Sequence, residues 1–181
     1  MMQKLEPGKF EKKFKESASL KKPPLEGLEE VIWKILEPVT DPEIPVLTIV
    51  DLGIIRDVKI NGDEVEVIIT PTYTGCPAMD MIAMNIKMAL IENGYTKIKI
   101  TSVLAPAWTT DWMSEDGKRK LKEYGIAPPH LRSEAPSDRL IACPQCHSTN
   151  TRLISEFGST ACKSLYQCND CKEPFDYFKC H

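Results

Sequence analysis

The sequence predicts an α+β fold, in which a small domain with the element order α-β-β-α-β-α precedes a C-terminal β zinc ribbon. Helix-like and strand-like spacings of apolar residues alternate between residues 25 and 129, and a polar, proline-containing segment follows them. Six of the seven cysteines lie after that segment. We therefore expect four regions: a tail (1–24), a first domain (25–129), a linker (130–139) and the ribbon (140–181).

The tail is rich in lysine, with seven lysines against three glutamates, and this composition is typical of a disordered, solvated chain. The whole protein has a formal charge of −3, so the residues after the tail carry a net charge of −7. An acidic body repels a phosphate backbone. Nucleic acid is therefore not an expected partner, although many zinc ribbons bind it.

The first domain is predicted to begin with a helix, because apolar residues from Leu25 to Leu36 recur at helical spacing until Pro38 ends the pattern. The next segment, Asp41-Pro42-Glu43-Ile44-Pro45, contains two prolines and is expected to be extended and stiff, presenting its carboxylates in a fixed way. Alternating apolar residues on both sides of Asn61-Gly62-Asp63 predict a β-hairpin over residues 54–69, because Asn-Gly tolerates the positive φ of a tight turn.

A second helix is predicted over residues 79–91, where Asn93-Gly94 ends the apolar stretch. Its methionines lie on or beside the apolar face, and we expect them to pack in the core rather than to bind metal. They are Met79, Met81, Met84 and Met88. A third strand follows around Ile98 and Ile100.

The loop after this strand carries Trp108 and Trp112, which are expected to cover the core rather than to line a groove. Ser114 is the predicted N-cap of a last helix that ends at Gly125. Together the helices should cover one face of a small mixed sheet.

The ribbon is predicted from two Cys-x-x-Cys turns with 21 residues between them, formed by Cys143, Cys146, Cys168 and Cys171. Two such turns at the ends of a short β-ribbon complete the tetrahedral thiolate shell that zinc prefers in structural sites. An iron–sulfur cluster on the same four thiolates is the main alternative. A disulfide framework or a thioredoxin-type redox motif explains the pair of turns less well.

Three further groups in the ribbon are candidates for additional metal ligands, namely Cys162, Cys180 and His181. They could stay free, replace a knuckle cysteine or form a second site. The N-terminus carries no apolar signal segment, so we expect reduced cysteines and a cytoplasmic protein. No apolar run approaches the length of about 18 residues that a membrane span needs.

Cys76 is the functional candidate in the first domain, because it lies between Gly75 and Pro77 where a strand meets a helix N-terminus. Such a position can lower a cysteine pKa from about 8.5 to between about 3.5 and 7.5. The alternative is a small buried residue at a tight junction. With only three histidines in the chain, a Cys-His hydrolase is not expected.

The motifs Asp41-Pro42-Glu43, Asp51-Leu52-Gly53 and Thr74-Gly75-Cys76-Pro77 resemble the metal-sulfur cluster biosynthesis domain of SufT and the cytosolic iron–sulfur assembly factors. The ribbon segments 157–163 and 174–181, together with 108–112 and 125–129, are similar to the PaaD family of phenylacetyl-CoA epoxidase subunits. This resemblance covers everything except the lysine-rich tail.

The resemblance implies an accessory protein rather than an oxygenase. Cys76 would be a metal- or cluster-handling thiol, able to hold iron or an iron–sulfur cluster transiently, with Thr74, Asp41 and Glu43 in the neighbouring signature loops. The expected partners are the di-iron oxygenase and iron–sulfur flavin reductase subunits of a phenylacetyl-CoA epoxidase system, and the iron–sulfur assembly machinery. The alternative is a zinc-stabilised scaffold that bridges those subunits without handling metal.

The residues themselves agree with a non-enzymatic role. The sequence has no Glu-x-x-His pair for a di-iron site and no glycine-rich loop for a dinucleotide. We therefore expect a maturation factor with no catalytic constellation of its own.

Overall fold

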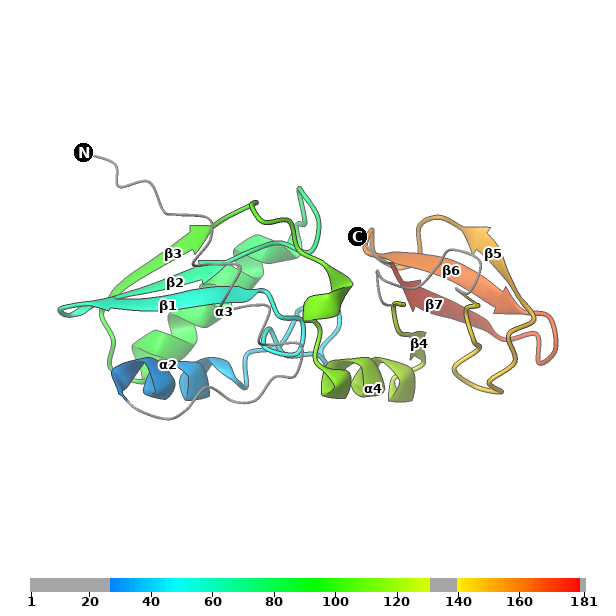
Figure 1. Ribbon diagram of the computed structural model, residues 1–181, viewed down its shortest axis with the longest axis horizontal. Coiled ribbons are helices and arrows are strands. Elements are labelled where there is room, and N and C mark those ends of the chain that lie inside the picture. Colours follow the sequence, from blue (N-terminus) through cyan, green and yellow to red (C-terminus); the bar gives the residue numbers. More distant parts are fainter. Residues whose placement is uncertain (1–26, 131–139, 180–181) are drawn as a thin grey trace.

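The computed structural model describes residues 27–130 and 140–179 and contains two β-sheets that follow one another along the long axis of the molecule (Figure 1). The predicted lysine-rich tail, Cys180 and His181 lie outside the described residues, as does nearly all of the predicted linker. Within the described residues the mixed α+β architecture is confirmed.

The first sheet has three strands in the order β1-β2-β3. Strands β1 (Ile55–Asn61) and β2 (Glu64–Ile69) form the predicted antiparallel hairpin around Gly62, whose φ is +64°. Strand β3 (Lys97–Ser102) runs parallel to β2, and helix α3 (Ala78–Glu92) makes the crossover between them. Helix α2 (Leu28–Leu36) precedes the sheet and packs against α3 and β1.

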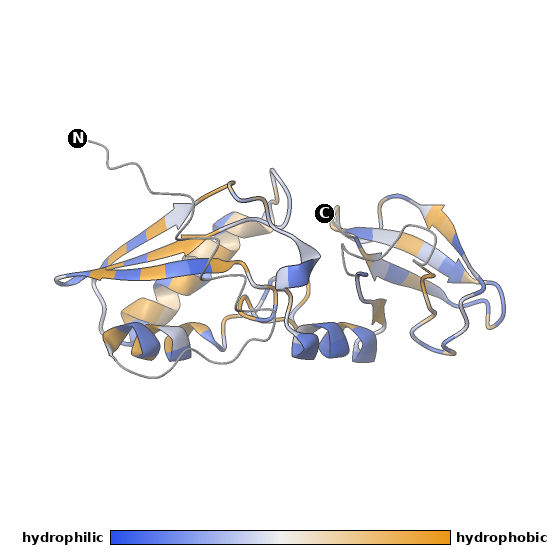
Figure 2. Cartoon of the chain, in the orientation of Figure 1, coloured by the Kyte–Doolittle hydropathy of each residue, from blue (hydrophilic) through white to orange (hydrophobic). Residues whose placement is uncertain are grey.

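The core of this part lies between the two helices and one face of the sheet, where apolar residues are concentrated (Figure 2). Alternate residues of β2 face it, so Val65, Val67 and Ile69 are buried. Every fourth residue of α3 faces them, and Ile82, Ile86 and Leu90 are at most 1% exposed.

The methionine prediction is wrong for three of the four residues. Met81, Met84 and Met88 are 51%, 57% and 51% exposed, whereas Met79 is partly buried against the core. The buried face of α3 is already filled by isoleucine and leucine, so the methionines fall on the opposite side of the helix.

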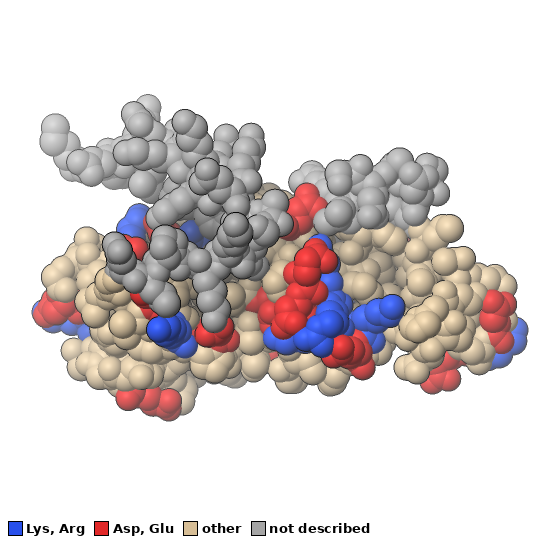
Figure 3. All heavy atoms as spheres, turned by 60° about the horizontal axis from the view of Figure 1, so that its bottom comes forward, with Lys and Arg blue, Asp and Glu red and all other residues tan. Residues whose placement is uncertain are grey.

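The last helix also departs from the prediction, although Ser114 caps it as expected by accepting a hydrogen bond from the Gly117 amide at 2.8 Å. Helix α4 (Glu115–Glu123) does not join the helical layer but lies between the two sheets, after a short 3-10 turn, η1 (Thr110–Trp112). Charged side chains of both signs gather over it (Figure 3). Only Gly117 and Leu121 are buried, so its few apolar residues are too sparse to cover a sheet.

The second sheet has four strands in the order β4-β7-β6-β5. Strands β5 (Thr151–Ser155), β6 (Lys163–Cys168) and β7 (Pro174–Phe178) form an antiparallel ribbon. Strand β4 (Ile126–Ala127) pairs with β7 in parallel, although it comes from the segment that we assigned to the first domain. The two parts of the chain are therefore joined by strand pairing, and not by the linker alone.

Side chains on one face of the β4-β7 pair lie in the ribbon core, and side chains on the other face lie in the core of the first part. Ala127 and Tyr177 are paired and lie in the small ribbon core, whereas Ile126 and Phe178 lie in the core of the first part. The Phe178 ring contacts the buried Trp108 with their ring centroids 6.2 Å apart. Trp108 thus covers the core of the first part as predicted, and Phe178 of the ribbon packs against it in the same core.

Asp51 of the second signature motif holds the loop before β1 against α4, and Gly53 lies close to the Trp112 backbone of η1. The Asp51 carboxylate accepts hydrogen bonds from Ser114 Oγ at 2.9 Å and from Lys120 Nζ at 2.7 Å. Burial raises the pKa of Asp51, but these bonds and one from the Thr48 amide lower it below its ordinary value. This motif is therefore a structural joint between the loop and the helix.

None of the helices within residues 27–130 and 140–179 is long and apolar enough to cross a bilayer.

We expect Gly53→Ala to destabilise the protein far more than Gly62→Ala. Both glycines have a positive φ, +66° and +64°, and a left-handed alanine costs about 1–2 kcal/mol. A Cβ at Gly53 would also lie 2.3 Å from the Trp112 carbonyl oxygen, whereas one at Gly62 would meet nothing within 4 Å. Urea unfolding of both variants should show at least twice the loss for Gly53→Ala, and equal losses would contradict the close packing at Gly53.

Candidate metal centre and the Cys76 site

The two Cys-x-x-Cys turns have the same backbone conformation. The His147 amide donates to the Cys143 carbonyl at 2.9 Å, and the Lys172 amide donates to the Cys168 carbonyl at 3.1 Å. Both donors are non-glycine residues in the left-handed region, with φ values of 64° and 68°. This matching strain at equivalent positions turns each chain back so that both thiols of a turn face one point.

Hydrogen bonds also tie the two turns to each other. The Asp170 carboxylate accepts from the Ser148 hydroxyl and from Asn150 Nδ2 at 2.8 Å, and Asn169 Nδ2 donates to Asn150 Oδ1 at 2.9 Å. The polar residues around the knuckles therefore hold the cysteines in register.

The four knuckle sulfurs lie within 4.8 Å of one another. The Cys143 and Cys171 sulfurs are 3.7 Å apart, and the Cys146 and Cys168 sulfurs are 3.5 Å apart. A tetrahedral ion with metal–sulfur bonds of about 2.3 Å places its ligands about 3.8 Å apart. A cluster would bind the thiolates through different irons and spread them further, so the geometry fits a single ion.

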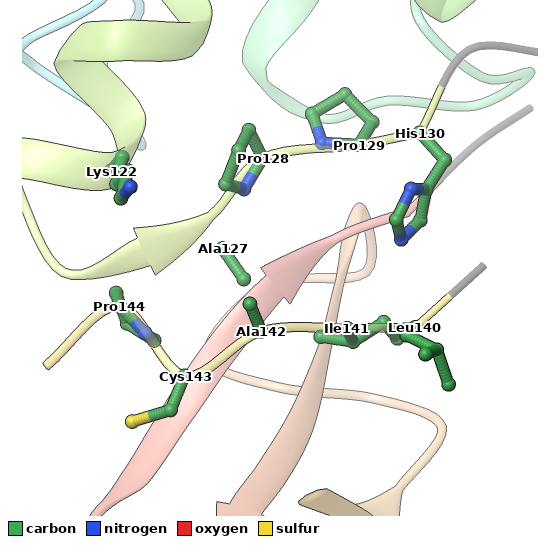
Figure 4. A pocket seen from close by; sticks show the side chains of 10 residues that line it. All are labelled: Lys122, Ala127, Pro128, Pro129, His130, Leu140, Ile141, Ala142, Cys143 and Pro144. Carbon is green, nitrogen blue, oxygen red and sulfur yellow. The ribbon is translucent and has the colours of Figure 1, made fainter. Parts of the chain in front are cut away.

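The ribbon's own core is small, so a bound ion would contribute much of its stability. Cys143 and Cys168 are fully buried and make up much of that core, with Ala127, Phe175 and Tyr177. A shallow cavity of about 180 Å³ lies between the end of α4 and the first knuckle, and mostly apolar residues line it (Figure 4). Few apolar contacts are thus available to replace the metal.

Cys76 lies at the predicted junction between β2 and α3. Gly75 has a φ of +84°, and the Cys76 amide donates to the Tyr73 carbonyl at 3.3 Å, which makes the sharp turn. Thr74 is exposed on this turn, and Cys76 itself is half-buried. The helix begins at Ala78, directly after Pro77.

The predicted low pKa of Cys76 is wrong. Burial raises the pKa of this thiol, and the Glu43 and Asp41 carboxylates raise it further. Hydrogen bonds from the Ala78 amide and the Tyr73 hydroxyl act in the opposite direction but are too weak to reverse the shift. The thiol is therefore protonated at neutral pH, because the effects of burial and two nearby carboxylates exceed that of the helix N-terminus.

The segment 41–45 forms a tight turn and not the extended, stiff segment that its prolines suggested. Asp41 Oδ1 accepts from the amides of Glu43 at 2.7 Å and Ile44 at 2.8 Å, and the Asp41 amide donates to the Leu47 carbonyl. Local side-chain hydrogen bonds replace the missing proline donors. Asp41 thus shapes the turn, and the turn holds Glu43 near the thiols.

Tyr73 and Cys162 were not part of the sequence prediction for this site, but Tyr73 is hydrogen-bonded to Cys76 and Cys162 contacts Glu43. Tyr73 packs against the same core, and burial raises its pKa to about 12, with Cys76 and Glu43 adding to the shift. Cys162, from the ribbon, is 5% exposed and donates to Glu43 Oε2 at 3.9 Å. Side chains alternate along β7, so Phe178 faces away from the ribbon core and lies in the core of the first part. This alternation in the sequence could have indicated that the loop of Cys162 lies near the first part.

The comparisons with known proteins match both parts of the chain. Residues 29–101 match the family description "Iron-sulfur cluster assembly protein", and residues 127–179 match "PaaD zinc beta ribbon domain". Over 150 residues the chain is 52% identical to an Escherichia coli (strain K12) protein, which is named as one of the subunits of a "Putative 1,2-phenylacetyl-CoA epoxidase". That alignment covers 82% of this chain and 91% of the relative.

A second relative, "Fe-S protein maturation auxiliary factor" of Porphyromonas gingivalis, is 39% identical over 51% of this chain and 90% of its own length. A solved domain of unknown function from Bacillus anthracis is 31% identical, with a TM-score of 0.48, over 51% of this chain and 90% of that domain.

These findings define a two-part protein, in which an iron–sulfur cluster assembly domain precedes a ribbon with a four-cysteine metal site. The chain belongs to the PaaD family, which combines these two parts.

We expect purified protein to contain about one zinc ion per chain and the Cys168→Ser variant to lose it, because a structural site needs all four thiolates. Cys162→Ser serves as the matched control and should keep the metal, since its sulfur points to Glu43 and not to the knuckles. Elemental analysis and circular dichroism during chelation provide the measurement. Full zinc retention by Cys168→Ser would contradict the ligand assignment.

We expect iodoacetamide to alkylate Cys76 slowly at neutral pH, with a rate that continues to rise above pH 9, because the folded thiol has a pKa above its ordinary value of 9.0. Glu43→Gln removes one carboxylate and should raise the rate at pH 8 by roughly twofold or more. Glu92→Gln, at the far end of α3, should leave it unchanged. Peptide mapping over a pH series measures the rates, and fast alkylation at pH 6 would restore the original low-pKa prediction.

Proposed function

We propose that this protein is an accessory factor of a phenylacetyl-CoA epoxidase system that helps to load or repair a metal centre of that complex through Cys76. The proposal is supported above all by the 52% identity to a relative named as a subunit of such an epoxidase. The match of residues 29–101 to iron–sulfur assembly proteins, and the maturation-factor relative, support the metal-handling part.

The chemistry required is ligand exchange. Cys76 would bind iron, alone or in a cluster, after giving up its proton, and a client side chain would then replace the thiolate on the metal without any change of oxidation state. The raised pKa of Cys76 suits this task, because a thiol that is protonated at rest is protected until a cation offsets the nearby carboxylates. The client would be the oxygenase or the reductase, and the iron–sulfur assembly machinery would supply the cargo.

In this proposal the ribbon ion is zinc and has a structural role. It would hold the loops of the ribbon against the first domain, and it would stay in place while the cargo passes through Cys76. The same proposal places the protein in the cytoplasm, where thiols remain reduced.

A scaffold that bridges the epoxidase subunits without handling metal is the second candidate. It is supported by exposed apolar side chains along α3, a surface that suits a protein partner. They are Met81, Met84, Met88 and Ile91.

The two candidate functions differ in when the protein is needed, because a maturation factor acts while the client acquires its metal and a scaffold acts during turnover. Oxygenase and reductase should be produced with the wild-type protein, with Cys76→Ser or without it, and purified protein should then be added back. We expect clients made without it, or with Cys76→Ser, to carry less than about half of their iron, and to recover only when iron and sulfide are supplied. Met79→Leu, which changes the same junction but keeps the thiol, should support full loading.

Full iron content in clients made without the protein would remove the maturation function. Immediate recovery of activity on simple addition, without iron or sulfide, would favour the scaffold.

A further inference from the structure

Cys162 does not belong to the metal centre of the knuckles. Its side chain is 5% exposed and lies in the apolar cluster of the first part of the chain, where Cys76 and Tyr73 pack against the same cluster. Its thiol donates to Glu43 Oε2 at 3.9 Å and is hydrogen-bonded to Thr160 Oγ1 at 3.0 Å. The loop thus carries a cysteine from the ribbon to Glu43, a carboxylate whose charge also acts on the thiol of Cys76.

The ribbon holds this cysteine firmly. The loop before β6 closes on itself, since the Gly158 amide donates to the Lys163 carbonyl at 2.8 Å, and Ser159 Oγ donates to Asp176 at 2.8 Å. A Cβ at Gly158 would lie 2.4 Å from Asp176 Oδ1, so only glycine allows this approach without a shift. The Cys162 carbonyl accepts from the Lys179 amide at 3.0 Å.

Glu43 is the common neighbour of the two thiols. Burial raises the pKa of Cys162 as it does that of Cys76, and in both cases the charges of Glu43 and Asp41 raise it further. Lys163 lowers the pKa of Cys162 only in part. Thiols that are costly to ionise among carboxylates become good ligands once a cation arrives, because the same carboxylates attract the cation.

We propose that Cys76, Cys162 and Glu43 form a composite metal site between the two parts of the chain, which takes one thiophilic divalent cation such as Fe(II). Two thiolates and a carboxylate suit a borderline-soft ion of this class. The proposal deepens the proposed function and rests on it only for the identity of the cargo as iron.

The geometry also makes the site a temporary one. In the described part of the chain only the knuckles bring three or more metal-ligating atoms within 4.8 Å of one another. An ion at the composite site must therefore draw the half-buried Cys76 and Glu43 side chains toward the fixed Cys162. The free energy that this rearrangement costs lowers the affinity for the ion, which suits a cargo that has to leave again.

Cobalt(II) is the probe for the first experiment, because thiolate–cobalt bonds give a near-ultraviolet charge-transfer band. Zinc-loaded full-length protein should be titrated with CoCl₂ without oxygen. We expect one extra cobalt per chain in the wild type and at least tenfold weaker binding in Cys76→Ser, Cys162→Ser and Glu43→Gln. Glu156→Gln, an exposed carboxylate on the ribbon, should bind like the wild type. Unchanged zinc content shows that each ribbon is intact, and wild-type binding by folded Cys162→Ser would overturn the proposal.

A second experiment needs no metal. Dibromobimane becomes fluorescent when both of its bromomethyl carbons have formed bonds to sulfur and two bromides have left, so it reports pairs of close thiols. We expect it to bridge Cys76 and Cys162 in the zinc-loaded protein, as shown by peptide mapping, and cobalt(II) to suppress the reaction. Separate labelling of the two thiols without any bridge would overturn the composite site.

The two proposals fail separately. If cobalt binds and the thiol bridge forms, but clients made without the protein carry full iron, only the maturation function is removed. If clients lose iron with Cys76→Ser but not with Cys162→Ser, and no thiol bridge forms, only the composite site is removed.

Discussion

The two-faced strand pair of β4 and β7 is the constraint on which the rest of the molecule depends. Because side chains alternate along a strand, Ala127 and Tyr177 face the ribbon core while Ile126 and Phe178 face the first core. Neither part can therefore turn relative to the other without exposing apolar surface that only the other part covers. The loop of Cys162 hydrogen-bonds to Asp176, on the same face as Phe178, so the packing that joins the two parts also fixes this cysteine beside Glu43.

The acidic residues of the signature motifs divide into two kinds. Asp41 Oδ1 and both carboxylate oxygens of Asp51 accept hydrogen bonds from backbone amides, a serine or a lysine, so these residues shape loops. Glu43 is held by one of those loops and meets a thiol. A motif of this type therefore combines residues that build the turn with one residue that the turn presents.

The cysteines likewise have two electrostatic environments. The knuckle thiols converge on one point at separations that match a single tetrahedral ion, and an ion there would stabilise them as thiolates although Cys143 and Cys168 are buried. Burial, and to a lesser extent the charges of nearby carboxylates, raise the pKa of Cys76 and of Cys162. In our proposals the knuckles hold an ion permanently and the composite site holds one temporarily, although both use the same side chain.

Local chemistry made much of this protein predictable from its sequence. The spacing of the knuckle cysteines, the Asn-Gly turn of the hairpin and the Ser114 cap each depend on residues close together in the chain, and all three are as predicted. One failure is local, because the Asp41 side chain folds residues 41–45 into a turn, and the others concern long-range packing. The sequence could not show which side of α3 would be buried, that α4 would leave the sheet, or that burial and carboxylates would outweigh a helix N-terminus at Cys76. The position of Cys162 was decided by tertiary structure alone, because its distance from Glu43 depends on how the ribbon packs across 119 residues of sequence separation.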